Sequence, residues 1–211
     1  MRPEISVIIT TYNRQQFLQR AMESVLTQTF SNFELIIIDD HSDIPPSINI
    51  PPGEDRVIPL RLPINTGYQV RPKNVGIMCS SGKYIAYLDD DNVFLPDHLE
   101  ILYNAIVKTQ ADVVYGDRVY KSTVPNEKRF MGKMSYDYDL SKINQGNYID
   151  TSDIMHTIQA INDIGFWDIF WERKADWLLM VKFGKAGKKI IHVPKIITEY
   201  WWHNTNLGTP K

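Results

Sequence analysis

The stretch that decides the fold is Ile85–Asn92, which reads IAYLDDDN. An apolar run typical of a buried strand ends at Leu88, and three aspartates follow it directly. Adjacent carboxylates repel one another, and the repulsion grows as they are withdrawn from water. Either these aspartates form an exposed turn, in which Asp and Asn are common, or a partner at the end of the strand compensates their charge.

Two other apolar runs end in polar residues in the same way. Ile5–Thr10 is mostly β-branched and continues into Thr11–Asn13, and Leu35–Ile38 runs into Asp39 and Asp40. Ligands of open parallel sheets bind beyond the carboxyl ends of the strands, so we expect the three ends to line one crevice if the strands are neighbours. Several carboxylates there suit a hard divalent cation, which would offset their repulsion and bind a diphosphate.

Helical periodicity separates these strands. Apolar side chains recur at helical spacing over Phe17–Leu26, and Asn13 with Gln16 predicts an N-cap for this helix. Pro96–Asp97 opens a second predicted helix, and Val113–Tyr115 is a further strand. The alternation predicts an α/β fold with a mostly parallel central sheet flanked by helices.

The pattern weakens after Asp117, and the second half of the chain is less regular. Residues 117–165 are polar and predict only strand fragments, such as Tyr148–Asp150. We expect a helix over Ala175–Lys185 and two strands, at Ile190–Val193 and Ile196–Trp201. The length favours one domain.

Composition argues against several classes of protein. The net charge of −2 over 211 residues provides no basic field for nucleic acid or an anionic membrane surface. The one cysteine, Cys79, cannot form an intrachain disulfide, which fits a reducing compartment. No stretch approaches the roughly 20 apolar residues of a membrane span. We therefore expect a soluble, cytoplasmic protein without a nucleic-acid partner.

Four segments together resemble the family 2 glycosyltransferases of the GT-A (Rossmann-like) fold. They are TTYNR at Thr10–Arg14, QTFSNFELIIIDDHS at Gln28–Ser42, GKYIAYLDDDN at Gly82–Asn92 and KADWLLMVKFG at Lys174–Gly184. The likeness covers nearly the whole chain and is strongest over residues 5–105. It implies a metal-dependent, inverting enzyme that moves a sugar from a UDP-sugar to a hydroxyl of a glycan or glycoconjugate.

The resemblance also divides residues 1–211, one domain, into two functional halves. Residues 1 to about 115 would bind the nucleotide sugar, with UDP-glucose or a related compound as the expected donor. Residues from about 116 to 211 would form the acceptor-binding half. Thr10 and Tyr12 would hold the nucleotide base, with the tyrosine ring stacking on it. Asp40 would accept the N3–H of uracil, which cytosine lacks, and Asp39 would support it from below.

In the same resemblance, the acidic triplet serves the ribose, the metal and the diphosphate. Asp90 would contact the ribose, and Asp91 would ligate Mn²⁺ or Mg²⁺ together with the diphosphate. Asp89, first in the Asp-x-Asp pattern, would serve either task. Many relatives carry Ala-Arg-Asn before the third strand, where this chain has Arg-Pro-Lys-Asn. Either Arg71 or Lys73 is therefore the candidate phosphate contact.

Two acidic residues of the second half complete the site that the resemblance implies. Asp176 would be the general base, although Ala175 stands where relatives carry a neighbouring glutamate. Asp150 matches an acidic position near the acceptor. We interpret His203 as a tail histidine, with metal ligation as the alternative.

Three other functions stay open at this point. Asp89-x-Asp91 fits the nucleophile motif of haloacid-dehalogenase-type phosphatases, but that motif lies on the first core strand, and two strand–helix units precede this one. A nucleotidyltransferase on a similar sheet usually has a glycine-rich loop after the first strand, and Thr10–Arg14 contains no glycine. A non-catalytic module that binds sugar nucleotides would need the pocket but not Asp176.

Overall fold

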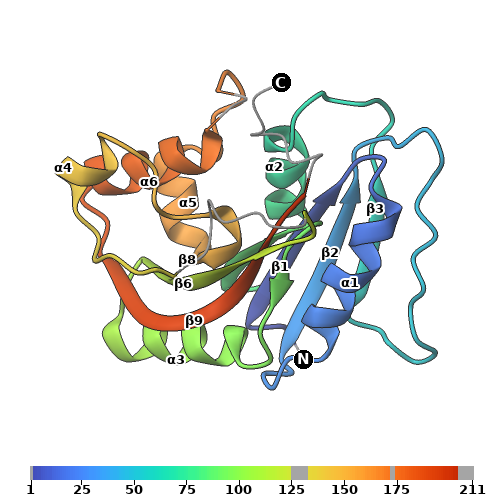
Figure 1. The fold of residues 1–211 in the computed structure, drawn as a ribbon, viewed down its shortest axis with the longest axis horizontal. Helices are drawn as coiled ribbons and strands as arrows, with labels where there is room; N and C mark the ends of the chain where they lie inside the picture. The colour runs from blue at the N-terminus through green and yellow to red at the C-terminus, as the bar shows by residue number, and fades with distance from the viewer. Residues whose placement is uncertain (1, 125–132, 172–173, 204–211) are drawn as a thin grey trace.

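The computed structural model describes residues 2–124, 133–171 and 174–203 (Figure 1). One sheet runs through it in the order β3-β2-β1-β4-β8-β6-β9-β5, with β7 paired to β6. The strands are β1 (Ile5–Thr11), β2 (Phe33–Asp39), β3 (Val57–Arg61), β4 (Tyr84–Asp89), β5 (Val93–Phe94), β6 (Val113–Ser122), β7 (Lys133–Met134), β8 (Ile154–Thr157) and β9 (Ile190–Trp202).

Helices cover both faces of this sheet (Figure 1). They are α1 (Gln15–Leu26), α2 (Val70–Cys79), α3 (His98–Thr109), α4 (Leu140–Ile143), the 3₁₀ helix η1 (Thr151–Asp153), α5 (Ile158–Ile164) and α6 (Ala175–Lys185). The predicted α/β class is confirmed, and α6 has the predicted bounds. In the described ranges no helix combines the length and apolarity needed to cross a membrane.

The three strands that end in polar residues are neighbours, which was the condition for their ends to line one crevice. β1 lies between β2 and β4 and is parallel to both. The register sets Thr11 beside Asp39 and Thr10 beside Asp89. All seven residues of β1 are buried, which explains its nearly continuous apolar sequence. One edge of the sheet therefore collects the polar ends of all three strands.

Two apolar layers fix these strands in place. On one face, α1 and α3 pack Leu18, Met22, Leu99 and Leu102 against inward residues of the sheet. The other face is covered by α2, α5 and α6, whose buried side chains include Val70, Ile77, Ile161, Leu179 and Phe183. Each layer is a continuous cluster of buried residues, so the strand ends project from a rigid support.

The second half is more ordered than its sequence predicts. β8 inserts antiparallel between β4 and β6, so this half shares the sheet of the first. β9 is one long curved strand instead of two, because a bulge opposite β6 absorbs Pro194, which has no N–H for a ladder. The strand predicted at Tyr148–Asp150 is wrong: the Asp150 carboxylate accepts from Ser152 N and caps η1.

Two predictions near the strand ends also need correction. Asn13 does not cap α1: its φ is +54°, and its side chain bonds the Asp43 side chain and backbone. Arg14 occupies the cap position without a side-chain cap bond. The sequence also gave no prediction of α2, which carries Pro72. Proline is tolerated there because the first turn of a helix has no internal partner for its N–H groups.

The start of β4 is held tightly against β1. The buried Glu34 carboxylate accepts from Ser6 Oγ and from Ser81 N at 2.6 Å, and Gly82 N donates to Ser6 Oγ at 2.9 Å. A Cβ on Gly82 would lie 2.6 Å from Ser6 N, a backbone atom. This close approach admits only glycine.

We therefore expect Gly82→Ala to lower the free energy of unfolding by about 1–3 kcal/mol, as overpacking of a tight site does. Gly146→Ala is the matched control, because a Cβ there meets nothing within 4 Å. Urea denaturation of both variants measures the difference. Equal stability of the two variants would show that β4 can move away from β1.

Candidate active site

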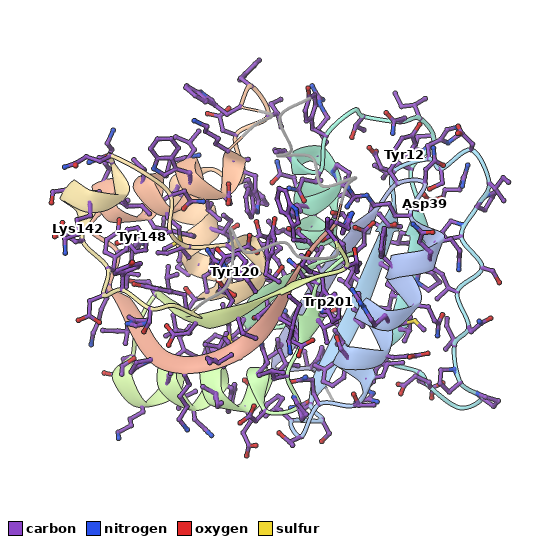
Figure 2. The ribbon with its side chains drawn as sticks, viewed as in Figure 1. Tyr12, Asp39, Tyr120, Lys142, Tyr148 and Trp201 are labelled. Carbon is purple, nitrogen blue, oxygen red and sulfur yellow. The ribbon has the colours of Figure 1, made fainter. Side chains whose placement is uncertain are left out.

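A pocket opens at the carboxyl ends of β1 and β2. Thr10 and Thr11 at the end of β1, Tyr12 and Arg14 after it, and Asp40 after β2 line this pocket. Residues between Asn65 and Pro72, together with Asp90, complete the lining. Tyr12 stands at its rim with 42% of its surface exposed, available to a planar ligand (Figure 2). Three residues predicted to bind the base, Thr10, Tyr12 and Asp40, thus line one pocket.

Asp40 is held in place by the loop that follows β3. Its carboxylate accepts from Thr66 Oγ1 at 2.9 Å, from Thr66 N at 3.1 Å and from Asn65 Nδ2 at 3.2 Å. Burial raises the pKa of Asp40, and the Thr66 bonds oppose that rise. Asp40 also lines the pocket.

Asp39 has a different surrounding. Its carboxylate accepts from Ser42 N at 2.9 Å and pairs with Arg61 Nη1 at 2.5 Å. It does not line the pocket, and its bonds fix the turn that leads from β2 to Asp40. The structure therefore shows Asp39 holding Ser42 and Arg61 on either side of the segment that begins with Asp40.

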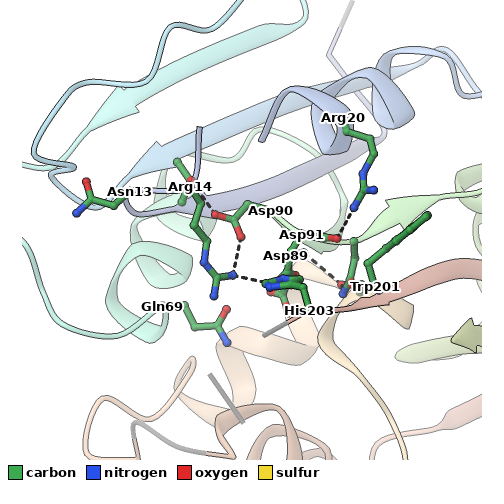
Figure 3. Close-up of polar contacts among 12 residues, drawn as sticks. Asn13, Arg14, Arg20, Gln69, Asp89, Asp90, Asp91, Trp201 and His203 are labelled. Carbon is green, nitrogen blue, oxygen red and sulfur yellow. Dashed lines mark hydrogen bonds and ion pairs between the residues drawn. The ribbon is translucent and has the colours of Figure 1, made fainter. Parts of the chain in front are cut away.

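The three aspartates after β4 each have a basic neighbour, as Figure 3 shows for Asp90 and Asp91. Asp89 Oδ1 lies 3.0 Å from Lys73 Nζ. Arg14 Nη1 bonds both Asp90 Oδ1, at 3.1 Å, and Asp91 Oδ2, at 2.8 Å. Lys73 and Arg14 therefore compensate the negative charge of the acidic triplet. The sequence analysis had expected a metal ion to do so.

Burial still dominates the protonation of Asp90 and Asp91. It raises the pKa of Asp90 to about 7, although Arg14 and a bond from Thr11 Oγ1 oppose the rise. Burial and the charge of Asp89 also raise the pKa of Asp91. Perturbed carboxylates gathered at strand ends are typical of functional sites.

His203 is wrongly predicted as a plain tail residue. It is 5% exposed, stacks on Phe17 with ring centroids 4.5 Å apart, and its Nε2 lies 3.1 Å from Asp91 Oδ2. In the described part of the chain no group of three or more His, Cys, Asp or Glu side chains is arranged to hold a metal. Asp91 and His203 nevertheless suit a cation at a nucleotide site, which often takes one or two protein ligands plus phosphate oxygens.

The two candidate phosphate contacts, Lys73 and Arg71, lie in different surroundings. Lys73 is fully buried and its Nζ also bonds Gln69 Oε1 at 2.8 Å, so it belongs to the acidic cluster. Arg71 is exposed on the other side of α2 and lines a second, apolar pocket with Ile64 and Met78. The structure brings Lys73 to the site but not Arg71.

Two further carboxylates face the acidic triplet from the second half. Asp176 is the second residue of α6, where Asn147 Nδ2 donates to it at 2.7 Å. Burial raises its pKa, while the backbone N–H of Trp177 and the charge of Lys73 lower it. Burial also raises the pKa of Asp150 to about 7, despite the charge of Arg118. The negative charge of Asp89 contributes to raising the pKa of both Asp150 and Asp176, so both carboxylates lie near the strand ends.

Sequence reasoning assigned no role at this site to three contributors and preferred a tail position for a fourth. They are Arg14 and His203, which contact Asp91, and Asn65 and Thr66, which hold Asp40. One signal was available: three adjacent carboxylates at a strand end require nearby cations, and Arg14 follows the neighbouring strand. Asn65 and Thr66 carry no such signal, because only the fold brings their loop to Asp40.

Comparisons with known proteins point to one family. The family model described as glycosyl transferase family 2 matches residues 6–170. Glycosyltransferase GlyG of Streptococcus pneumoniae is 27% identical over 82% of this chain and 51% of its own. A β-1,3-glucosyltransferase of Campylobacter jejuni, which acts on GalNAc(5)-diNAcBac-PP-undecaprenol, is 33% identical over 66% of this chain and 46% of its own. The chain thus spans about half the length of these curated relatives.

Solved structures share the fold. The Staphylococcus aureus TarS fragment 1–349 in complex with UDP-GlcNAc superposes with a TM-score of 0.77 at 17% identity, covering 96% of this chain and 60% of that one. The same fragment with UDP gives a TM-score of 0.74, also at 17% identity, over 94% of this chain and 60% of that one.

The raised pKa of Asp150 predicts a stability effect with a defined pH dependence. Its folded-state pKa of about 7 lies above the ordinary value of 3.8, so the folded protein holds this proton more tightly than the unfolded chain. Asp150 therefore lowers stability progressively from about pH 4 to pH 7, and by a constant amount above that. We expect Asp150→Asn to match wild type near pH 4.

At pH 8 the same variant should gain on the order of 1 kcal/mol or more in unfolding free energy. Urea denaturation across this pH range measures the gain, with Asp55→Asn, an exposed loop position, as the matched control. A variant less stable than wild type at pH 8 would mean that attraction to Arg118 outweighs the burial of Asp150.

Proposed function

The chain belongs to glycosyl transferase family 2. We propose that it transfers a sugar from a UDP-sugar to a hydroxyl of a glycan or glycoconjugate. The observation that carries the proposal is the meeting of three strand ends. They place a pocket lined by Tyr12 and Asp40 beside the acidic triplet, with Asp176 near Asp89. A binding module would need only the pocket, whereas Asp176 adds a proton acceptor.

In this proposal the base of the donor lies between Tyr12 and Asp40. The exposed tyrosine ring offers a stacking surface, and the Asp40 carboxylate accepts the N3–H of uracil. Asp90, which Thr11 Oγ1 holds at 2.7 Å, faces the same pocket at the position proposed for the ribose. Fixed acceptors in a partly buried pocket favour uracil over a base that lacks the N3–H.

A divalent cation, Mn²⁺ or Mg²⁺, is proposed at Asp91 with His203 beside it. When bound, such an ion would stabilise the negative charge of the departing diphosphate. Neighbouring side chains orient the two proposed ligands. Arg20 Nη2 donates to the Asp91 carbonyl at 2.9 Å, and the Arg20 guanidinium stacks on Trp201. The Phe17 ring supports the His203 ring.

Asp176 is proposed to accept the proton of the acceptor hydroxyl as that oxygen attacks the anomeric carbon. Its raised pKa makes it a better proton acceptor than an ordinary carboxylate, and Asn147 fixes its orientation. Attack opposite the leaving diphosphate inverts the anomeric configuration. Asp150 is proposed to bind a neighbouring hydroxyl of the acceptor.

The donor sugar is proposed to be a hexose or N-acetylhexosamine. The TarS fragment is described in complex with UDP-GlcNAc, and the Campylobacter relative is named for glucose transfer. A panel of UDP-sugars incubated with Mn²⁺, with release of UDP as the readout, separates these candidates. Failure of every donor to react or to raise the melting temperature would contradict the proposed function.

We expect Asp176→Asn to lower transfer by roughly 10²-fold or more, because it removes the proton acceptor with little change in shape. UDP affinity should stay close to wild type, since Asp176 does not line the donor pocket. Release of UDP in the presence of acceptor measures transfer, and calorimetry measures affinity. Asp163→Asn makes the same change at an exposed position of α5 and serves as control. Transfer at the wild-type rate in Asp176→Asn would move the role of base to Asp150.

A further inference from the structure

We propose that Arg14 is an exchangeable counter-ion, which neutralises Asp90 and Asp91 in the nucleotide-free protein and turns to the donor diphosphate when a divalent cation binds. Arg14 and the cation would then compete for the same carboxylate. This inference rests on the proposed function, because it takes the diphosphate and the cation as ligands of the site.

The position of Arg14 is the first argument. The residue lies at the junction of β1 and α1, lines the donor pocket, and its Nη1 bridges Asp90 and Asp91 (Figure 3). Its side chain is 21% exposed, against 6% for Asp90 and 9% for Asp91. The guanidinium is thus the accessible partner in this group, and the pocket lies directly beside it.

The crowding of Asp91 is the second argument. Its Oδ2 accepts from Arg14 at 2.8 Å and lies 3.1 Å from His203 Nε2. A dication on this carboxylate would stand in contact with the guanidinium, and like charges at that distance repel. A cation that binds Asp91 Oδ2 therefore displaces Arg14 from that oxygen.

The other basic residues at the site are less suited to exchange. Lys73 is fully buried between Asp89, Gln69 and the Trp167 ring. Arg20 bonds the backbone carbonyl of Asp91, which a bound cation leaves unchanged, and its guanidinium stacks on Trp201. Only Arg14, among these three, holds the carboxylate proposed for the metal and also lines the pocket.

A diphosphate gives Arg14 a new partner of the right chemistry. Guanidinium binds phosphate oxygens through two parallel N–H bonds, a geometry that a lysine ammonium cannot reproduce. UDP would draw Arg14 away from Asp91 and so raise the affinity for the cation. Linkage requires that the cation raise the affinity for UDP by the same factor.

The test is the affinity of the nucleotide-free protein for Mn²⁺, measured from the electron paramagnetic resonance signal of free Mn²⁺. Arg14→Met removes the competitor and should bind Mn²⁺ at least about tenfold more tightly than wild type. The same variant should bind UDP, by calorimetry with Mn²⁺ saturating, at least about tenfold more weakly. Arg14→Lys keeps the charge and should lie between the two.

Arg56→Met is the matched control, since it loses the same charge from a residue that pairs with Glu54 near the start of β3. It should match wild type in both titrations. Melting temperatures confirm that each variant is folded. If Arg14→Met does not fold, Arg14→Lys still provides the test. Unchanged or weaker Mn²⁺ binding by Arg14→Met and Arg14→Lys would overturn the exchange.

The outcomes separate this inference from the proposed function. If wild type binds UDP but no protein binds Mn²⁺, the donor site stands and the exchange is overturned. If wild type binds neither UDP nor Mn²⁺, the proposed function fails as well. If Mn²⁺ affinity rises in Arg14→Met while UDP affinity stays unchanged, Arg14 competes with the cation but does not bind the diphosphate, and the exchange is again overturned.

Discussion

One edge of the sheet carries several carboxylates at the points where strands leave the buried core. The arrangement of the site depends on how the charge of these carboxylates is compensated. Asp89, Asp90 and Asp91 could not stay there without positive charge, because burial raises the pKa of Asp90 to about 7 even though Arg14 opposes the rise. Lys73 and Arg14 supply that charge from two different elements, α2 and the end of β1. The parallel register of β1 with β2 and β4 then determines which other polar groups share the edge.

Within the first half, β1, α1, β2, β4 and α3 could be predicted from sequence because their signals are local, whereas β3 and α2 were missed. A strand buried on both faces reads as a continuous apolar run, and polar residues after it mark the carboxyl end. The alternation of strands and helices predicted the α/β class, whereas the neighbour relation of β2, β1 and β4 came from the structure. Helix α6 was also predicted with its bounds, since its apolar residues and the glycine near its end are all within one segment.

Other parts depend on contacts that no local pattern encodes. β8 is short and polar at His156, and it forms because β4 and β6 offer backbone partners on either side. The 3₁₀ turn at Asp150 replaces the predicted strand because the carboxylate caps it. His203 is buried only because β9 brings the end of the described chain back to Asp91. These features arise from tertiary pairing, which overrides weak local preference.

We propose that the strand ends form a site in which Asp40 recognises uracil. Calorimetric titration with UDP and CDP, at saturating Mn²⁺, tests it most directly. Loss of one hydrogen bond to a carboxylate costs about 1.5–3 kcal/mol, so we expect wild type to bind UDP about tenfold to a hundredfold more tightly than CDP. Asp40→Asn should abolish this preference. Equal affinity of the wild-type protein for the two nucleotides would contradict the account.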